Sequence, residues 1–384
     1  MSRTFFATCA LGLEEVLADE LRGLGAASVR TQRGRVSFLG PLTMGYRACL
    51  WCRSASRVQE QLFRDRPAGS RRQLYDAVYD FDWAPSLQPS NTLAVSASVR
   101  DSRATDSRFV ALVTKDAIVD QLRKRFGDRP DVDAERPDVP IRVILTRERA
   151  TVLRDLSGDS LHRRGWRPIQ VKSPLNEATA AGLLMLAGWS GDRALYDPMR
   201  GSGTFLVEAA HMAQDRAPGL RRRFAFERWP DLDREAWKTL RDEALARHEA
   251  GRERPLSIVG SDHHSGALSL ARRSLVAAEV RHVVRVRRCS VEHATPETTP
   301  ELVVSNPPWG LRMDRENLEQ AWSQLGEFLK AHCGEATAFL LSGDAALTQP
   351  LRMRAARRHP IRIGPVDARW IRYEVLPPAP RLKE

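Results

Sequence analysis

The chain has 384 residues, 42% of them hydrophobic, and a formal net charge of +12 at pH 7. A chain of this length is expected to form two or three domains with packed cores, and no stretch of it is long and apolar enough to cross a bilayer. The excess of positive charge favours a polyanionic partner, bound with an affinity that falls as salt rises.

The cysteines and the N-terminal segment favour a cytoplasmic protein. Five cysteines are an odd number in a large chain, which is typical of reduced thiols. The segment Met1 to Phe6 lacks the apolar core and cleavage site of a signal peptide. Cys49 and Cys52 have the spacing of zinc ligands, but no second pair follows nearby, so we interpret them as packing residues and expect no metal site.

The first half of the chain mixes strands with amphipathic helices. Apolar residues alternate in the expected strands and recur every three or four residues in the expected helices. In chain order the predicted elements are strand 5–8, helix 13–24, strand 35–39, helix 46–58, strand 93–99, helix 109–126, and strands 141–145 and 151–156.

A basic and aromatic segment closes this half. It contains Arg163, Arg164, Trp166 and Arg167 after a Ser-Gly-Asp turn. Arginine and tryptophan side chains contact phosphates and stack on bases in RNA-binding proteins. Two interpretations stay open for this segment, a solvated linker and a strip that faces RNA.

From Asn176 onwards helices and strands alternate, which indicates a mostly parallel α/β sheet. The predicted elements are helix 176–188, strand 194–196, helix 205–212, strand 257–259, a helix that ends at 278, strand 283–286, strand 302–304, helix 316–332, strand 337–341 and a terminal hairpin over 361–376. The charged segment 215–255 is expected to be a partly helical insertion on one rim.

Two strand ends in this half carry residues suited to a ligand that contains a ribose. Asp197 leads into the turn Gly201-Ser202-Gly203-Thr204, where a ligand can approach the backbone beside a helix N-terminus. Asp262 follows the next strand and could accept hydrogen bonds from ribose hydroxyls, although a helix N-cap is the simpler interpretation of that residue alone. The turn is not a dinucleotide fingerprint, because Leu206 occupies the third glycine position, and it lacks a P-loop lysine.

A further strand end carries the turn Asn306-Pro307-Pro308-Trp309. The prolines make this turn rigid and prevent the strand from continuing. The Asn306 carboxamide oxygen and nearby carbonyl groups can accept hydrogen bonds from a planar amine, while the Trp309 ring can stack on the base that carries it. A simple proline-rich strand cap is the alternative. Together with the two acids, the turn fits an S-adenosylmethionine-dependent methyltransferase that acts on a nucleobase amine.

The same motifs resemble known proteins. The segment Asp197 to Thr204 (Asp-Pro-Met-Arg-Gly-Ser-Gly-Thr), Asp262 and Asn306-Pro307-Pro308-Trp309 resemble the amino-methylating class I methyltransferases. With Gly12-Leu13-Glu14-Glu15 and the segment Val113 to Asp120, nearly the whole chain resembles the RlmL family of bacterial 23S rRNA guanine-N2 methyltransferases.

This resemblance implies the domains and the partners. We expect a ferredoxin-like domain over residues 1–60, a THUMP RNA-binding domain over 61–168 and a Rossmann-like class I methyltransferase domain with a seven-stranded sheet over 169–384. S-adenosyl-L-methionine is the expected cofactor and RNA the expected partner. Neither DNA nor a membrane is expected as a partner.

The resemblance also assigns roles to individual residues. It implies that Asp197 and the turn Gly201-Ser202-Gly203-Thr204 hold the amino-acid end of the donor and that Asp262 holds its ribose. A residue near Ser290 would hold the adenine, and Asn306, Pro307, Pro308 and Trp309 would form the catalytic turn. The chain departs from the family at Arg200, which replaces a cysteine, at Trp309, which replaces a tyrosine, and at Ser290, near which the family has an acid.

Three alternatives to guanine-N2 methylation of 23S rRNA stay open. They are guanine-N2 methylation of tRNA, adenine-N6 methylation, and a catalytically silent RNA-binding or ribosome-assembly factor. The last is favoured by Arg200 and Ser290, because both disturb the expected cofactor contacts.

Overall fold

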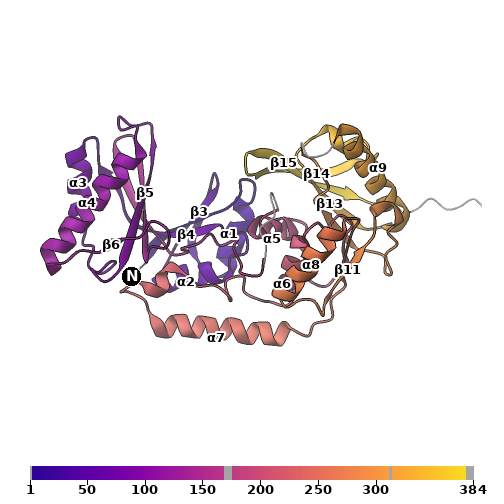
Figure 1. Cartoon of the computed structure of the whole chain (residues 1–384), viewed down its shortest axis with the longest axis horizontal. Coiled ribbons are helices and arrows are strands. Elements are labelled where there is room, and N and C mark those ends of the chain that lie inside the picture. The colour runs from indigo at the N-terminus through magenta and orange to yellow at the C-terminus, as the bar shows by residue number, and fades with distance from the viewer. Residues whose placement is uncertain (1, 168–174, 311–313, 378–384) are drawn as a thin grey trace, which may run out of the picture. The chain divides into compact units, whose positions relative to one another are not determined.

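The computed structural model describes residues 2–167, 175–310 and 314–377. The chain divides into two compact units (Figure 1). The N-terminal unit comprises residues 1–8, 18–161 and 221–243, and the C-terminal unit comprises residues 9–17, 162–220 and 244–384. Part of the predicted insertion 215–255 therefore packs with the N-terminal unit. The expected boundary at 168–169 lies outside the described residues.

The N-terminal unit is built on an eight-stranded sheet in the order β2-β3-β1-β4-β8-β7-β5-β6. Its strands are β1 (Arg3–Thr8), β2 (Ala27–Gln32), β3 (Arg35–Gly40), β4 (Arg57–Pro67), β5 (Thr92–Arg100), β6 (Asp131–Val132), β7 (Val139–Thr146) and β8 (Arg149–Asp155). Its helices are α2 (Leu42–Trp51), α3 (Arg71–Tyr79), α4 (Ser107–Phe126) and the 3₁₀ helix η1 (Ala225–Arg228), while α1 (Glu14–Gly23) and α7 (Arg234–Gly251) contribute residues to both units.

The strand register puts most of the buried side chains of this sheet on one face. Phe5 of β1 lies opposite Glu60 of β4, and Glu60 lies opposite Arg154 of β8. Arg154 lies opposite Ile141 of β7, which in turn lies opposite Val95 of β5. Directly opposed residues share a face of a sheet, so these five side chains point the same way.

Helices cover that face. A Cβ atom on Gly45 of α2 would lie 2.8 Å from the Phe5 ring, which shows how closely this helix approaches the sheet. The ring of Phe63 contacts that of Phe81, just after α3, with centroids 5.4 Å apart. Helix α4 packs on β5 and β7. Side chains of the opposite face, such as Arg142, remain exposed.

The predicted helix 46–58 was wrong at its C-terminal end. The helix ends at Trp51, and Val58 lies in β4. The backbone N–H groups of Arg53 and Ser54 donate to the carboxylate of Glu20 at 2.6 and 3.0 Å, so a side chain distant in sequence satisfies the backbone there. Strands β2, β4 and β6 and helix α3 were not predicted.

The C-terminal unit has a seven-stranded sheet in the order β11-β10-β9-β12-β13-β15-β14, as the fold prediction required. Strands β9 to β13 pair in parallel, and the β14–β15 hairpin is antiparallel. Its strands are β9 (Leu195–Asp197), β10 (Ile258–Asp262), β11 (Val284–Arg288), β12 (Leu302–Ser305), β13 (Thr337–Ser342), β14 (Ala355–Ile363) and β15 (Val366–Glu374). Its helices are α5 (Glu177–Leu186), α6 (Thr204–Ala213), α8 (Ser265–Ala277), α9 (Arg315–His332) and the 3₁₀ helices η2 (Val291–His293) and η3 (Ala346–Thr348).

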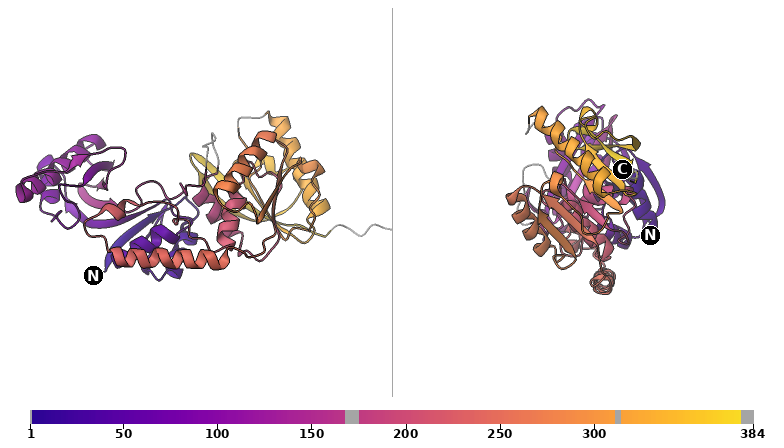
Figure 2. Two further views of the ribbon diagram at one scale, coloured as in Figure 1. Left: turned by 60° about the horizontal axis from the view of Figure 1, so that its bottom comes forward. Right: turned by 90° about the vertical axis from the view of Figure 1, so that its right-hand side faces the viewer.

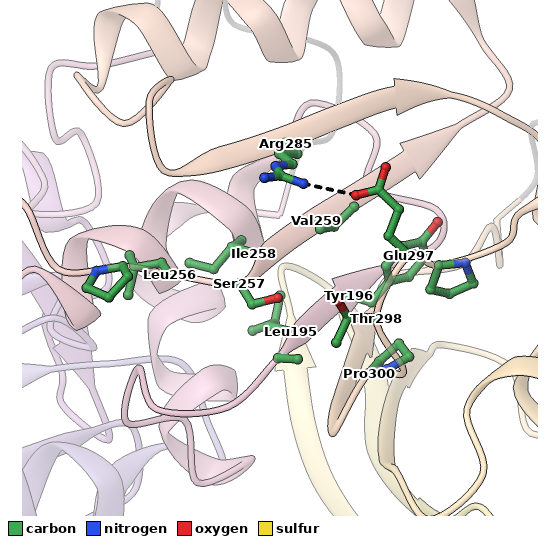
Figure 3. A pocket seen from close by; sticks show the side chains of 13 residues that line it. Leu195, Tyr196, Leu256, Ser257, Ile258, Val259, Arg285, Glu297, Thr298 and Pro300 are labelled. Atoms are coloured by element: carbon green, nitrogen blue, oxygen red, sulfur yellow. Dashed lines mark hydrogen bonds and ion pairs between the residues drawn. The ribbon is translucent and has the colours of Figure 1, made fainter.

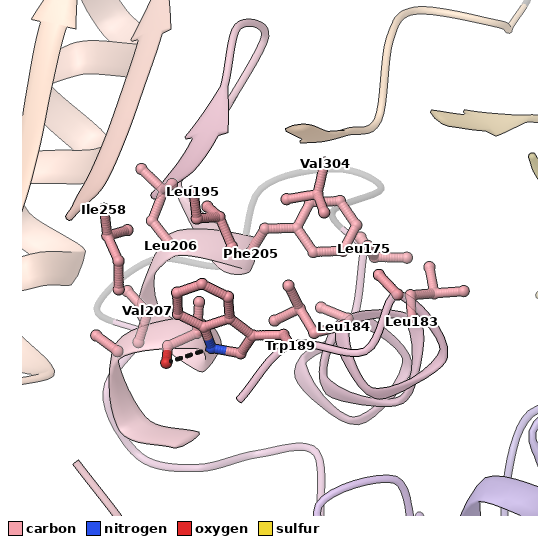
Figure 4. Close-up of a cluster of buried hydrophobic side chains, with 14 of the residues drawn as sticks. Leu175, Leu183, Leu184, Trp189, Leu195, Phe205, Leu206, Val207, Ile258 and Val304 are labelled. Atoms are coloured by element: carbon pink, nitrogen blue, oxygen red, sulfur yellow. Dashed lines mark hydrogen bonds between the residues drawn. The ribbon is translucent and has the colours of Figure 1, made fainter. Parts of the chain in front are cut away.

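Helices cover both faces of this sheet (Figure 2), and a hydrophobic core lies on each face. Successive residues of β12 point to different cores: Leu302 and Val304 belong to one core and Val303 to the other. The first core is formed with α5, α6 and α8 and includes Trp189, whose indole N–H donates to the Ala209 carbonyl at 2.9 Å (Figure 4). The second core is formed with α9. Over the described ranges, no helix has the length and apolar character needed to span a membrane.

A buried ionic network holds the helical face of the N-terminal unit. The fully buried Arg154 donates to Glu60 at 2.6 Å and to Asp231 at 2.9 Å, and its guanidinium lies 3.6 Å from the centroid of the Trp229 ring. Arg3 also pairs with Glu60, at 2.6 Å. The network therefore fixes the segment around Asp231 to strands β1, β4 and β8.

We expect Arg154→Ala to destabilise this unit by about 3 to 5 kcal/mol, because it leaves the buried Glu60 carboxylate with much of its charge uncompensated. Urea unfolding followed by tryptophan fluorescence measures the change. Arg149→Ala on the same strand is the matched control, since Arg149 pairs with Asp65 in an exposed position and should cost at most about 1 kcal/mol. Equal losses in the two variants would contradict this assignment.

Candidate active site at the carboxyl edge of the parallel sheet

The predicted site residues meet at the carboxyl ends of neighbouring strands. Strand β9 pairs with β10 on one side and with β12 on the other. Their last residues are Asp197, Asp262 and Ser305, and Asn306 follows directly. In open α/β sheets this edge, near a reversal of strand order, is where ligands bind.

Asp197 is a buried acid linked directly to the neighbouring strand. It is 1% exposed, and its Oδ1 accepts hydrogen bonds from the Ser305 hydroxyl at 2.7 Å and from the Met199 backbone N–H at 3.1 Å. Burial raises the pKa of Asp197 to about 7, although both hydrogen bonds act in the opposite direction, and the nearby charge of Asp262 raises it further. Ser305 was not recognised in the sequence, because its partner lies 108 residues away.

The glycine turn is open on the side where a ligand would approach. Gly201 and Gly203 have φ angles of 54° and 79°, which glycine adopts without strain. A Cβ atom on Gly201 would meet no atom within 4 Å. The carboxylate of Asp262 accepts from the Gly201 N–H at 3.0 Å and from the His264 N–H at 2.9 Å. It therefore ties the turn to β10, and the N-cap of α8 is His264 rather than Asp262.

Arg167 belongs to this turn. Its guanidinium donates to Ser202 Oγ at 3.4 Å and to Thr204 Oγ1 at 3.1 Å, and it pairs with Glu177 at 2.8 Å. Its side chain is 9% exposed. Arg167 thus supports the glycine turn from within the C-terminal unit, a role that its place in a basic segment did not reveal.

Two more residues of the predicted RNA-facing strip point inwards. Trp166 is 2% exposed and belongs to the first core of the C-terminal unit. Arg164 is 4% exposed and lies 3.7 Å from the buried Glu208. Of the four residues in the strip only Arg163 is exposed. Burial of Arg164, Trp166 and Arg167 argues against the strip and follows from their packing on α5 and α6.

Arg200 lies beneath the turn. It is 4% exposed, and its Nη1 donates to the carbonyl groups of Gly201 at 2.7 Å and Ala267 at 3.1 Å. Burial lowers its pKa, while Asp262 and Asp197 act to raise it. Gly260 leaves room for the Arg200 side chain, since a Cβ atom there would lie 3.0 Å from its Cδ. The arginine thus connects the turn to the first residues of α8.

Ser290 lies beyond the next strand end. It follows β11, the neighbour of β10, and the N–H of Cys289 before it donates to the Asp262 carbonyl at 3.1 Å. The Ser290 hydroxyl is hydrogen-bonded to His293 Nδ1 at 2.8 Å. The structure therefore places Ser290 on the edge that carries Asp262, with its hydroxyl engaged locally.

The Asn306-Pro307-Pro308-Trp309 turn is held by two indole groups. The Trp309 N–H donates to Asn306 Oδ1 at 2.7 Å, and the Trp322 N–H of α9 donates to the Pro308 carbonyl at 2.9 Å. The Trp309 ring lies on Gly343, where a Cβ atom would come within 2.3 Å of it. Trp309 stays partly exposed. The sequence indicated the turn but not the bond between Trp309 and Asn306, nor the need for Gly343.

A separate hollow of about 360 Å³ opens at the opposite edge of the same sheet (Figure 3). It is lined by the first residues of β9 and β10, including Leu195 and Ile258, and by an ion pair between Arg285 and Glu297 at 2.9 Å. Parallel α/β sheets bind ligands at their carboxyl edge, so this hollow is not the candidate active site.

The sheet order and the residues at its carboxyl edge define a class I methyltransferase fold. Sequence profiles match an RlmL ferredoxin-like domain at residues 4–59, a THUMP domain at 70–155 and an RMKL-like methyltransferase domain at 164–372. The chain therefore belongs to the RMKL-like methyltransferase family.

Individual relatives agree with this assignment. A ribosomal RNA large subunit methyltransferase K/L of Syntrophotalea carbinolica is 40% identical over 97% of the chain, which covers 53% of that relative. The chain thus spans about half the length of the K/L relatives it matches. A putative RNA methyltransferase of Synechocystis sp. is 34% identical over 97% of both chains. The crystal structure of a putative methyltransferase complexed with SAH is 28% identical, with a TM-score of 0.89 over 97% of this chain and 98% of that one.

The raised pKa of Asp197 predicts a pH-dependent stability. The unfolded chain releases this proton near pH 3.8, whereas the folded protein retains it up to about pH 7. The folded state therefore binds the extra proton in this window, and stability falls as pH rises through it, with a slope of up to about 1.4 kcal/mol per pH unit. Urea unfolding at several pH values measures the slope. Asp197→Asn should flatten it selectively between these pH values, and an unchanged slope would contradict the prediction.

Proposed function

We propose that this protein uses S-adenosyl-L-methionine to methylate the exocyclic N2 amine of a guanine in 23S rRNA. One observation carries the proposal: the hydrogen bond between Ser305 and Asp197, 2.7 Å long, joins the strand that leads into the glycine turn to the strand that presents Asn306. A donor at the turn and a base at Asn306 would therefore share one edge of the sheet.

The described residues fit the donor. The open backbone at Gly201, beside the N-terminus of α6, suits the carboxylate of its amino-acid end. The carboxylate of Asp262 is 11% exposed and uses one hydrogen bond on each oxygen, which leaves lone pairs for ribose hydroxyls. Ser290, on the same edge, is assigned to the adenine end. When bound, the donor supplies an electrophilic methyl group on a sulfonium.

The base side is formed by the Asn306-Pro307-Pro308-Trp309 turn. Asn306 Oδ1 already accepts the Trp309 N–H, and an amide oxygen has a second lone pair that can accept one N2–H. The Pro307 carbonyl accepts the other N2–H, while the Pro308 carbonyl is engaged by Trp322. These two acceptors would orient the amine so that its lone pair leaves conjugation and points at the methyl group. Catalysis then rests mainly on positioning.

The target guanine must leave its stack to reach this edge. The partly exposed ring of Trp309 would support the extruded base by stacking. Gly343 sets the position of that ring, because a larger residue would displace it.

Transfer of labelled methyl groups to unmodified transcripts tests the proposal. Purified protein is incubated with 23S rRNA or with tRNA transcripts, and the nucleosides are analysed by mass spectrometry. N2-methylguanosine in 23S rRNA is the expected product. N2-methylguanosine in tRNA alone would identify tRNA as the substrate. N6-methyladenosine would identify the adenine N6 amine as the methylated group. Absence of transfer to every transcript, together with absence of donor binding in calorimetry, would favour a silent RNA-binding factor.

Asn306→Ala should abolish turnover while the dissociation constants for S-adenosyl-L-methionine and RNA stay within about twofold of wild type. The reason is that the variant loses the acceptor for the amine and the hydrogen bond from the Trp309 N–H, while the glycine turn, Asp262 and the N-terminal unit are unchanged. Calorimetry with the donor and filter binding with RNA provide the controls. Turnover at the wild-type rate would refute the role of Asn306.

Trp309→Phe should lower kcat about five- to tenfold, because it keeps an aromatic surface but removes the hydrogen bond that fixes the Asn306 carboxamide. Trp309→Leu removes both the aromatic surface and the hydrogen bond, so it should lower kcat further. Single-turnover kinetics at saturating donor separate the effects. If Trp309→Phe matched wild type, the indole N–H would have no positioning role.

A further inference from the structure

The face of the eight-stranded sheet that lies opposite α2, α3 and α4 has no assigned role. Because Ile141 and Val95 point to the helices, the residues that alternate with them point away. We call this surface the open face. It carries Phe6 of β1, Arg35 of β3, Gln61 of β4, Ser96 and Ser98 of β5, Arg142, Ile144 and Thr146 of β7, and Thr151 of β8.

Three shallow hollows follow this face and its edges, with volumes of about 410, 660 and 930 Å³. The hollows of about 410 and 930 Å³ share Arg35, Ile144 and Thr146, whereas the hollow of about 660 Å³ has no lining residue in common with them. Each is lined only by residues of the N-terminal unit. Eight strands spaced about 4.8 Å apart give the sheet a width of about 34 Å. The open face is therefore an extended surface that carries two adjoining hollows and a separate third one.

The charge on this surface is predominantly positive. Ten arginines line the hollows, namely 33, 35, 57, 64, 100, 136, 142, 147, 223 and 228, against five acids, namely 65, 101, 135, 155 and 159. Three of these acids are neutralised, since Asp65 pairs with Arg149, Asp101 with Arg100 and Asp155 with Arg57. Three of the ten arginines form ion pairs themselves, namely Arg57, Arg100 and Arg228, the last with Asp138, so seven arginines stand outside these pairs against the acids 135 and 159.

Three exposed arginines show this surplus most clearly. Arg33 lies in the β2–β3 turn, Arg64 in β4 and Arg142 in β7, so that each lines a different hollow. All three are exposed, and none has an ion-pair partner in the described part of the chain. Exposed arginines in this arrangement suit phosphate groups.

The centre of the face suits bases and backbone. Ser96, Ser98 and Thr151 are small, so a strand of nucleic acid can approach the sheet closely. The guanidinium of Arg35 lies 4.7 Å from the centroid of the Phe6 ring. An arginine positioned over an aromatic ring can also contact an unstacked base.

We propose that the open face is the surface on which the N-terminal unit binds the RNA substrate, through phosphate contacts of its arginines and base contacts at its centre. This inference rests on the proposed function for the identity of the polyanion. It differs from the sequence-based expectation, because it moves the RNA contacts from the buried residues Arg164, Trp166 and Arg167 to another surface.

The test compares two triple variants of the full chain with equal charge change. Arg33→Gln, Arg64→Gln and Arg142→Gln remove open-face charges, whereas Arg71→Gln, Arg108→Gln and Arg123→Gln remove exposed charges from α3 and α4. Fluorescence anisotropy measures binding of a labelled hairpin from 23S rRNA with a single-stranded loop, at several salt concentrations. The open-face variant should bind about 10- to 100-fold more weakly, and the slope of log affinity against log salt should fall by about two or more. The control variant should change affinity less than about threefold.

Kinetics separate this inference from the proposed function. The open-face variant should raise the KM for RNA and retain kcat and donor affinity. Equal effects of the two variants, or wild-type RNA affinity in the open-face variant, would overturn the inference while methylation by wild type still stood. A change in oligomeric state without a change in RNA affinity would overturn it in favour of self-association. If wild type bound RNA through this face without methylating it, only the proposed function would fail.

Discussion

The hydrogen bond from Ser305 to the buried Asp197 is the contact on which the candidate site depends. It joins the carboxyl ends of β12 and β9, so the glycine turn and the Asn306 turn keep one relative position. Burial favours the protonated form of Asp197. Without the hydrogen bond from Ser305, this buried acid would lose a hydrogen-bond partner. The glycine turn is held by further hydrogen bonds, which involve Asp262, Arg200 and Arg167.

A second constraint is the pleat of the N-terminal sheet. Register fixes which residues of eight strands point to the helices, and a shift by one residue would exchange the two faces. The covered face therefore gathers apolar residues and the Arg154 network, while positive and small polar residues collect on the open face. The residues that stabilise this unit and those of the proposed RNA-binding surface thus lie on two sides of one sheet.

Prediction from sequence succeeded where local patterns dominate and failed where distant contacts decide. The glycine turn and the proline turn were located because glycine and proline restrict the backbone locally. Helix 46–58 was extended too far, because the carboxylate of Glu20 satisfies the backbone at Arg53 and Ser54. Edge strand β2, with few apolar residues, offered little periodic signal. Trp166 was assigned to a surface although it fills a core.

The sequence by itself determined the fold class, the family resemblance and the three strand ends that carry Asp197, Asp262 and Asn306, since each depends on residues close together in the chain. Only the tertiary structure decided the partners: Ser305 for Asp197, Arg167 for the glycine turn, and Gly343 beneath Trp309. It also decided which arginines are exposed. Such contacts join residues from different elements, and their distances follow from packing and strand register, which local sequence patterns do not specify.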